Sequence, residues 1–192
     1  MLDTHRRLER AGRIIQEPAF RRNKGLGNEV GYYIFDYPAT DELVVREWLR
    51  DMQNKHSTAA EGFVLVVFDL YDIIIDLLEQ EGFLESCFRF EQKQGMDRIV
   101  KAVGRMLRLS DDAGVIVEHI RSRVPENAVV FLAGVGKCYP VLRAHKVLNN
   151  LHQALDTVPV VMFYPGKYDG QELSLFGSIK DDNYYRAFRL VD

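Results

Sequence analysis

Three short runs of apolar residues constrain this fold more than any other feature of the sequence. They lie at 63–68, 129–133 and 158–164, and helical periodicity follows the first two. A strand without polar alternation is buried on both faces, which is typical of the inner strands of a parallel sheet. We therefore predict an open, mainly parallel α/β sheet with helices on both faces, in which 63–68 is a central strand.

The remaining elements follow from periodicity and from turn residues. An aromatic strand at 31–37 is closed by Pro38, and the Thr40 hydroxyl is placed to cap the helix that follows. Pro165 and Gly166 are expected to close the strand at 158–164. We expect a C-terminal edge strand at 184–191 and amphipathic helices at 4–16, from about 71 until Gly95 breaks the pattern, 96–109, 113–124 and 138–155.

Length and composition indicate one domain over residues 1–192, with 1–27 forming a basic helix and its connector. Apolar residues make up 47% of the 192-residue chain, which is enough for a core without disulfides. The two cysteines are far apart in sequence, as expected for buried thiols in a reducing compartment. The N-terminal residues have no apolar signal segment, and the longest apolar run, 63–68, is too short to cross a bilayer. We predict a cytoplasmic protein without membrane contact.

The segment Gly134-Val-Gly-Lys137 after the strand at 129–133 is the most suggestive motif for phosphate chemistry. Glycines, a helix start and a lysine together suit an anion. The P-loop pattern nevertheless fails, because Phe131 and Cys138 occupy the positions of its first glycine and its Ser/Thr. The favoured interpretation is a tight strand-to-helix turn, with Pro140 in the first helical turn. The alternative is an anion or nucleotide site that uses Gly134, Gly136, Lys137 and Asp69.

Asp69 and Asp72 follow the strand at 63–68 and allow two interpretations. Two carboxylates can bind a divalent cation. Alternatively, Asp69 caps the next helix and Asp72 complements its dipole, which is favoured because no third acidic ligand has a suitable spacing. We predict no metal site, no cofactor and no catalytic residue, and hence no enzyme.

Charge is uneven along the chain, and two segments have the composition of an interface. Residues 1–24 hold seven Lys and Arg residues against three acids, although the net charge of the chain is −3. Such an arm suits nucleic acid, an acidic partner or plain solvent exposure. The C-terminal loops are rich in tyrosine and cations, which suit interfaces. The predicted interface residues are Arg6, Arg10, Arg13, Arg21, Arg22, Lys167, Tyr168, Tyr184, Tyr185 and Arg186.

Several blocks of sequence, in a fixed order, resemble the BrxB family of bacterial BREX phage-defence systems. They lie at 68–72, 130–145 (VFLAGVGKCYPVLRAH), 148–151, 159–170 (PVVMFYPGKYDG) and 183–190 (NYYRAFRL). The resemblance covers essentially the whole chain. It implies a role in phage defence beside a DNA methyltransferase, a large ATPase and the alkaline-phosphatase-like protein PglZ, with no settled activity of its own. The order of strands and helices also resembles a P-loop ATPase core without its nucleotide motifs, by analogy of fold alone.

The function predicted from the sequence is therefore that of a non-catalytic adaptor that binds other BREX proteins, with PglZ as the expected partner. One alternative is a degenerate nucleotide or phosphate binder at the strand ends. Another is an accessory module that contacts DNA through the N-terminal arginines. The acidic remainder of the chain favours DNA contact only within a larger complex.

Overall fold

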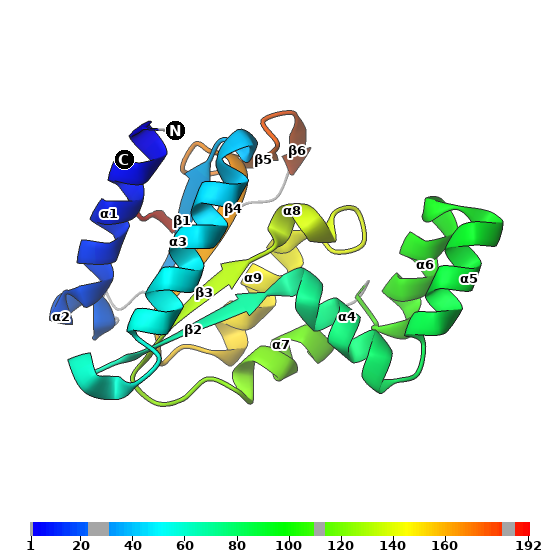
Figure 1. Cartoon of the computed structure of the whole chain (residues 1–192), viewed down its shortest axis with the longest axis horizontal. Coiled ribbons are helices and arrows are strands. Elements are labelled where there is room, and N and C mark those ends of the chain that lie inside the picture. Colours follow the sequence, from blue (N-terminus) through cyan, green and yellow to red (C-terminus); the bar gives the residue numbers. More distant parts are fainter. Residues whose placement is uncertain (1, 23–30, 110–113, 182–186) are drawn as a thin grey trace.

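The computed structural model describes residues 2–22, 31–109, 114–181 and 187–192 (Figure 1). The sheet order is β2-β3-β4-β1-β7, and all of these neighbours pair in parallel. Their bounds are Tyr32–Tyr37 (β1), Val64–Asp69 (β2), Ala128–Ala133 (β3), Val160–Tyr168 (β4) and Phe188–Arg189 (β7). Two short strands, Leu173–Leu175 (β5) and Ile179–Asp181 (β6), add antiparallel pairs: β5 pairs with the end of β4, and β6 pairs with β5. The predicted open α/β sheet is confirmed.

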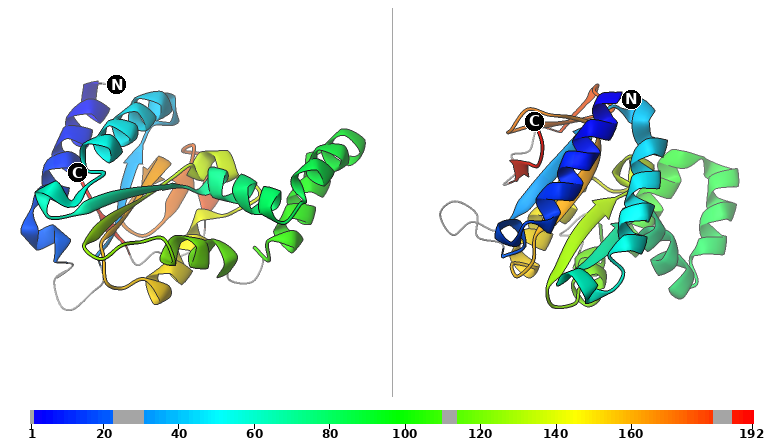
Figure 2. Two further views of the ribbon diagram at one scale, coloured as in Figure 1. Left: turned by 60° about the horizontal axis from the view of Figure 1, so that its bottom comes forward. Right: turned by 60° about the vertical axis from the view of Figure 1, so that its left-hand side comes forward.

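Helices cover both faces of the sheet (Figure 2). On one face lie α1 (Leu2–Gln16), the short α2 (Pro18–Arg21) and α3 (Glu42–Lys55). On the other lie α4 (Leu70–Gln80), α7 (Gly114–Arg121) and α9 (Ala144–Ala154). At the far end from α1, the helices α5 (Leu84–Gln94) and α6 (Met96–Met106) stand side by side (Figure 1). The remaining short helices are Ala39–Asp41, Ala59–Glu61 and α8 (Val135–Cys138).

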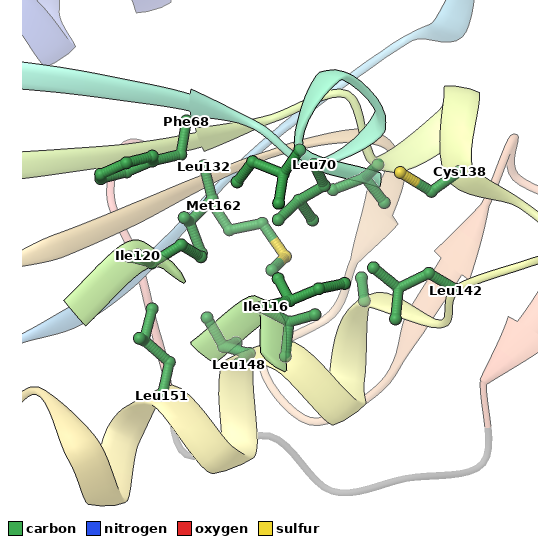
Figure 3. Packing of buried hydrophobic residues seen from close by; sticks show 14 of the residues in the cluster. Phe68, Leu70, Ile116, Ile120, Leu132, Cys138, Leu142, Leu148, Leu151 and Met162 are labelled. Atoms are coloured by element: carbon green, nitrogen blue, oxygen red, sulfur yellow. The ribbon is translucent and has the colours of Figure 1, made fainter. Parts of the chain in front are cut away.

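Strand alternation divides the core into two layers. On β3, Val130 and Leu132 pack toward α4, α7 and α9, whereas Phe131 packs toward α1 and α3. The first layer is filled by aliphatic side chains such as Ile116, Leu148 and Met162 (Figure 3). All six residues of β3 are buried, because helices cover both faces and β2 and β4 cover both edges.

The prediction that 63–68 forms a central strand is wrong, because β2 lies at one edge of the sheet and pairs only with β3. Val66 and Val67 are only partly buried, each packing against one of the two core layers. The apolar run of β2 indicates only that helices cover both faces of this strand. It does not indicate whether the strand has a hydrogen-bonded neighbour on one edge or on both.

Helix boundaries differ most from the predictions at three places. Thr40 does not begin α3, which starts at Glu42 after a 3-10 turn. The helix expected from 71 to 95 is two helices, because Gly82 takes a left-handed conformation (φ 71°). The helix expected at 138–155 is α9 alone, because α8 ends at Cys138 and residues 139–143 between the two helices are not helical.

The strand expected to close at Pro165–Gly166 instead continues to Tyr168. Gly166 pairs with Leu175 of β5, and a side chain there would overlap the Ser174 carbonyl group. Glycine thus extends the strand by allowing close backbone contact. The expected edge strand at 184–191 is present as the two residues of β7, and Tyr184, Tyr185 and Arg186 lie outside the described residues.

Candidate functional site

The carboxyl ends of β2 and β3 bring Asp69 beside the turn at Gly134, because Asp69 is aligned with Ala133 in the parallel register. Asp69 accepts hydrogen bonds from the backbone N–H groups of Tyr71 (3.0 Å) and Asp72 (3.3 Å). It therefore caps α4, as the favoured interpretation of the sequence expected, and satisfies two donors that a helix start leaves unpaired.

Lys137 completes a cluster of charged side chains with Asp69 and Asp72. Its Nζ lies 2.5 Å from Asp69 Oδ2 and 3.4 Å from Asp72 Oδ1, and 5.3 Å from the ring centre of Tyr71. Burial alone would lower the pKa of Lys137, but the hydrogen bond and charge of Asp69, together with Asp72, raise it above the ordinary value. The three side chains carry a net negative charge, so a phosphate here would meet repulsion and would have to displace Asp69 from the lysine.

Neighbouring side chains leave little space at both glycines of the turn. Gly134 is left-handed (φ 75°), and a side chain there would overlap the Asp69 carboxylate. A methyl group on Gly136 would lie 3.0–3.2 Å from side-chain atoms of Phe176 and Pro165. The arrangement of Gly134, Gly136, Lys137 and Asp69 therefore supports the interpretation as a structural turn rather than an anion site. Within the described residues, no group of three or more His, Cys, Asp or Glu side chains is placed to hold a metal ion.

A cleft of about 290 Å³ lies between these strand ends and α3. Inside it the Tyr37 hydroxyl donates to Glu42 Oε2 at 2.6 Å, and Arg46 pairs with Glu42 at 2.9 Å. Burial, followed by the charge and hydrogen bond of Glu42, raises the pKa of Tyr37 above its ordinary value. Tyr37 therefore stays protonated at neutral pH and acts as a hydrogen-bond donor.

The predicted interface residues that the structure describes differ in their surroundings. Arg6, Arg10 and Arg13 are exposed on α1, where Arg6 also pairs with Asp3 at 3.8 Å. Arg21 is held over the ring of Phe63 at 4.9 Å.

The other predicted contacts that the structure describes are Arg22, Lys167 and Tyr168. Arg22 bonds the Pro18 carbonyl oxygen at 3.2 Å, and Lys167 is exposed on β4. Tyr168 is only 2% exposed, and its hydroxyl lies within hydrogen-bond distance of two backbone oxygens, those of Ala187 (2.7 Å) and Gly170 (3.0 Å). The prediction of Tyr168 as a surface contact is wrong, because its side chain is buried beneath the C-terminal segment that begins at Ala187.

Sequence reasoning missed a polar cluster centred on Asp36. Arg7 donates to Asp36 Oδ1 (2.8 Å), to the Asp36 backbone oxygen (2.6 Å) and to the Val191 backbone oxygen (3.1 Å). The Tyr168 N–H donates to Asp36 Oδ2 at 3.0 Å. Arg189 donates to the Tyr168 carbonyl oxygen. Arg7 was predicted only as part of a basic arm, although its place beside the apolar stripe of α1 indicated a half-buried position.

The two cysteines are buried, Cys87 in α5 and Cys138 at the end of α8. Burial, reinforced by the Asp69 charge, raises the pKa of Cys138 to about 12. We expect the C87S variant, which retains only Cys138, to react with a thiol reagent at pH 8 more than about a thousandfold more slowly than after denaturation, because so little thiolate is present. A stopped-flow absorbance assay measures both rates, and equal rates would contradict this burial.

Comparison with known proteins places the chain in a family. Residues 66–190 match the model of the family described as "BREX protein BrxB". The chain belongs to the BrxB family. A BREX protein BrxB of Bacillus cereus (strain H3081.97) is 50% identical over 178 residues, covering 93% of this chain and 92% of that protein. One of Escherichia coli O9:H4 (strain HS) is 35% identical over 189 residues, covering 96% and 90%.

BrxB membership confirms the resemblance drawn from the sequence and identifies a component of BREX systems. No solved structure matches the chain, so the analogy to a P-loop ATPase core stays a prediction. Among the described residues, no helix of this chain is both long enough and apolar enough to span a bilayer.

Proposed function

We propose that this chain is a non-catalytic, cytoplasmic adaptor of a BREX phage-defence assembly that binds other BREX proteins, PglZ first among them. Membership of the BrxB family supports the part of the proposal that places the chain in a BREX assembly. The turn at the strand ends supports a structural rather than a catalytic role for its charged residues, because Lys137 is paired with Asp69 and Asp72.

The observation that carries the proposal is an apolar groove where α4 meets α5 and α6. Its volume is about 180 Å³, and most of its lining is apolar. Three large side chains at the groove are strongly exposed: Tyr71 (41%), Phe88 (48%) and Met96 (53%). Exposed apolar side chains that gather around a groove mark protein contact sites, because water leaves them when a partner binds.

The exposed arginines of α1 offer a second contact, as the sequence predicted. Arg6, Arg10 and Arg13 repeat at helical spacing on α1, and α1 lies at the opposite end of the molecule from α5 and α6 (Figure 1). Charges at the rim of an interface mainly steer association and set specificity. We therefore assign the larger share of the binding energy to the groove and an orienting role to α1.

Recovery of partners from cells that carry the full BREX locus tests the adaptor function. The tagged wild-type chain is expected to recover PglZ. Phe88→Glu is expected to weaken recovery at least about tenfold, because a charge would be buried at the contact. Leu43→Glu makes the same chemical change at a side chain that is 75% exposed on α3, away from the groove, and is expected to recover PglZ normally.

Two outcomes contradict the proposal. The adaptor function fails if the wild-type chain recovers no BREX protein. The assignment of the groove fails if Phe88→Glu and Leu43→Glu recover the same amount. In that case the triple variant R6E/R10E/R13E reports whether α1 is the contact.

A further inference from the structure

The cleft of about 290 Å³ beside α3 lies where open α/β sheets bind small molecules. It is lined by α3 and by residues near the carboxyl ends of β2 and β3, among them Val67, Asp69 and Ala133. The chain leaves β1 toward α3 on one face of the sheet, and it leaves β2 and β3 toward α4 and α8 on the other. Ligands of such sheets bind beyond the carboxyl ends of the strands, where the chain departs toward opposite faces.

The charges that line this cleft are balanced except at Arg50. Both acids of the lining already have a cation. Arg46 donates its Nε to the Glu42 carboxylate at 2.9 Å. Lys137 Nζ lies 2.5 Å from the Asp69 carboxylate. Arg50 is exposed and forms no salt bridge with any residue that the structure describes. The cleft therefore offers one uncompensated positive charge.

Polar and apolar groups occupy different parts of the lining. Arg50 and Gln53 are three residues apart and share one flank of α3, so both can donate hydrogen bonds to one ligand. Val45, Leu49 and Val67 line the same cleft with apolar surface. Val67 is only partly buried, although it points into the core layer below α3. A ligand held by Arg50 would place its body against this apolar surface and remove it from water.

The lining identifies the chemical class of the ligand. A guanidinium group matches a carboxylate, which it contacts with two parallel hydrogen bonds. A polyphosphate would bring several negative charges beside Glu42 and Asp69 and would be repelled. A cationic ligand would have to displace Arg46 or Lys137 from these acids. The volume is close to the lower end of small-molecule pockets, which indicates a compact ligand.

We propose that this cleft binds a small monocarboxylate, with its carboxylate on Arg50 and Gln53 and its apolar body against Val45, Leu49 and Val67. The site is additional to the adaptor function. It is separate from the apolar groove, because Phe88 does not line it.

NMR titration of the ¹⁵N-labelled full chain with butyrate, 3-phenylpropionate and indole-3-propionate tests the site. We expect at least one of these acids to bind at millimolar concentration and to shift the amide signals of Val67 and Ala133. The primary amide of the acid that binds best is expected to bind at least about tenfold more weakly, because it lacks the charge-assisted hydrogen bonds. Acetate has the charge without the apolar body and is expected to bind at least about tenfold more weakly as well.

A matched pair of variants locates the carboxylate. Arg50→Gln is expected to weaken binding at least about tenfold, since it removes the uncompensated charge. Arg98→Gln makes the same change at an exposed arginine on α6, outside the cleft, and is expected to leave binding within about twofold of wild type. Thermal unfolding without ligand checks that both variants fold.

Four results would overturn the proposal: no binding of any of the three acids at millimolar concentration, equal binding of an acid and its amide, equal weakening by Arg50→Gln and Arg98→Gln, or shifts that leave Val67 and Ala133 unchanged. Phe88→Glu should bind the carboxylate normally. The adaptor function and the carboxylate site therefore succeed or fail separately.

Discussion

Replacing Arg7 with methionine is expected to lower the free energy of unfolding by about 3–5 kcal/mol, the range measured when one partner of a buried ion pair is removed. The Arg7 and Asp36 side chains are only 15% and 11% exposed. Methionine keeps much of the length and apolar surface of the arginine stem over Phe35, where the guanidinium carbon lies 5.0 Å from the ring centre. The loss therefore reports the charge and hydrogen bonds rather than the packing.

The expected effect is large because Arg7 joins three parts of the chain. Its guanidinium group links α1 to the carboxyl end of β1 through Asp36 and to the C-terminal segment through the Val191 backbone oxygen. Without it, Asp36 keeps the N–H of Tyr168 and a more distant Arg189 at 4.0 Å. A half-compensated carboxylate in this position retains most of its desolvation cost.

Two controls separate this explanation from a general effect on α1. Arg10→Met changes an exposed arginine on the same helix and is expected to cost less than about 0.5 kcal/mol. The double variant R7M/D36N is expected to regain part of the loss, because it no longer buries an uncompensated charge. Urea denaturation measures all three, and equal stabilities of Arg7→Met and Arg10→Met would contradict the role assigned to Asp36.

The sequence predicted which face of each major element is buried better than it predicted which elements lie next to one another. Periodicity reports which side chains are buried, so α1 and the strands at β1, β3 and β4 were found. Sheet order depends on contacts between distant segments, and the edge position of β2 was therefore missed. Asp36 in the aromatic strand β1 likewise did not indicate a buried polar cluster by itself, because its partner Arg7 comes from α1 and its N–H donor from β4.

The candidate sites show the same division between local and distant information. The cap formed by Asp69 involves residues two and three positions away and was correctly favoured from the sequence. The apolar groove is instead assembled from α4, α5, α6, α8 and residues 139–141. The left-handed break at Gly82 sets α5 apart from α4, and a single glycine did not reveal that turn within a continuous helical pattern.

Replacing Gly134 with alanine is expected to lower the free energy of unfolding by about 3–4 kcal/mol, measured by urea denaturation. About 1–2 kcal/mol comes from placing an L-residue in the left-handed region, since φ is 75° here. The rest comes from overlap of the new methyl group with the Asp69 carboxylate. Asp69 can move aside only by giving up the cap of α4 and its pair with Lys137, which costs energy in turn.

Gly82 provides a matched control. Its φ is 71°, and nothing lies within 4 Å of a methyl group added there. Gly82→Ala therefore carries the backbone penalty alone, about 1–2 kcal/mol. The difference between the two variants measures the overlap, and equal losses would show that the close approach of Gly134 to Asp69 contributes nothing.

A double-mutant cycle assigns the overlap to Asp69. In a background of Asp69→Ala, the methyl group at residue 134 no longer meets a carboxylate, so Gly134→Ala is expected to cost only as much as Gly82→Ala does. The two single losses should then sum to more than the loss of the double variant, with a coupling of about 1–3 kcal/mol between the two sites. Additive losses would mean that Asp69 and Gly134 act independently, and the packing explanation for this glycine would be withdrawn.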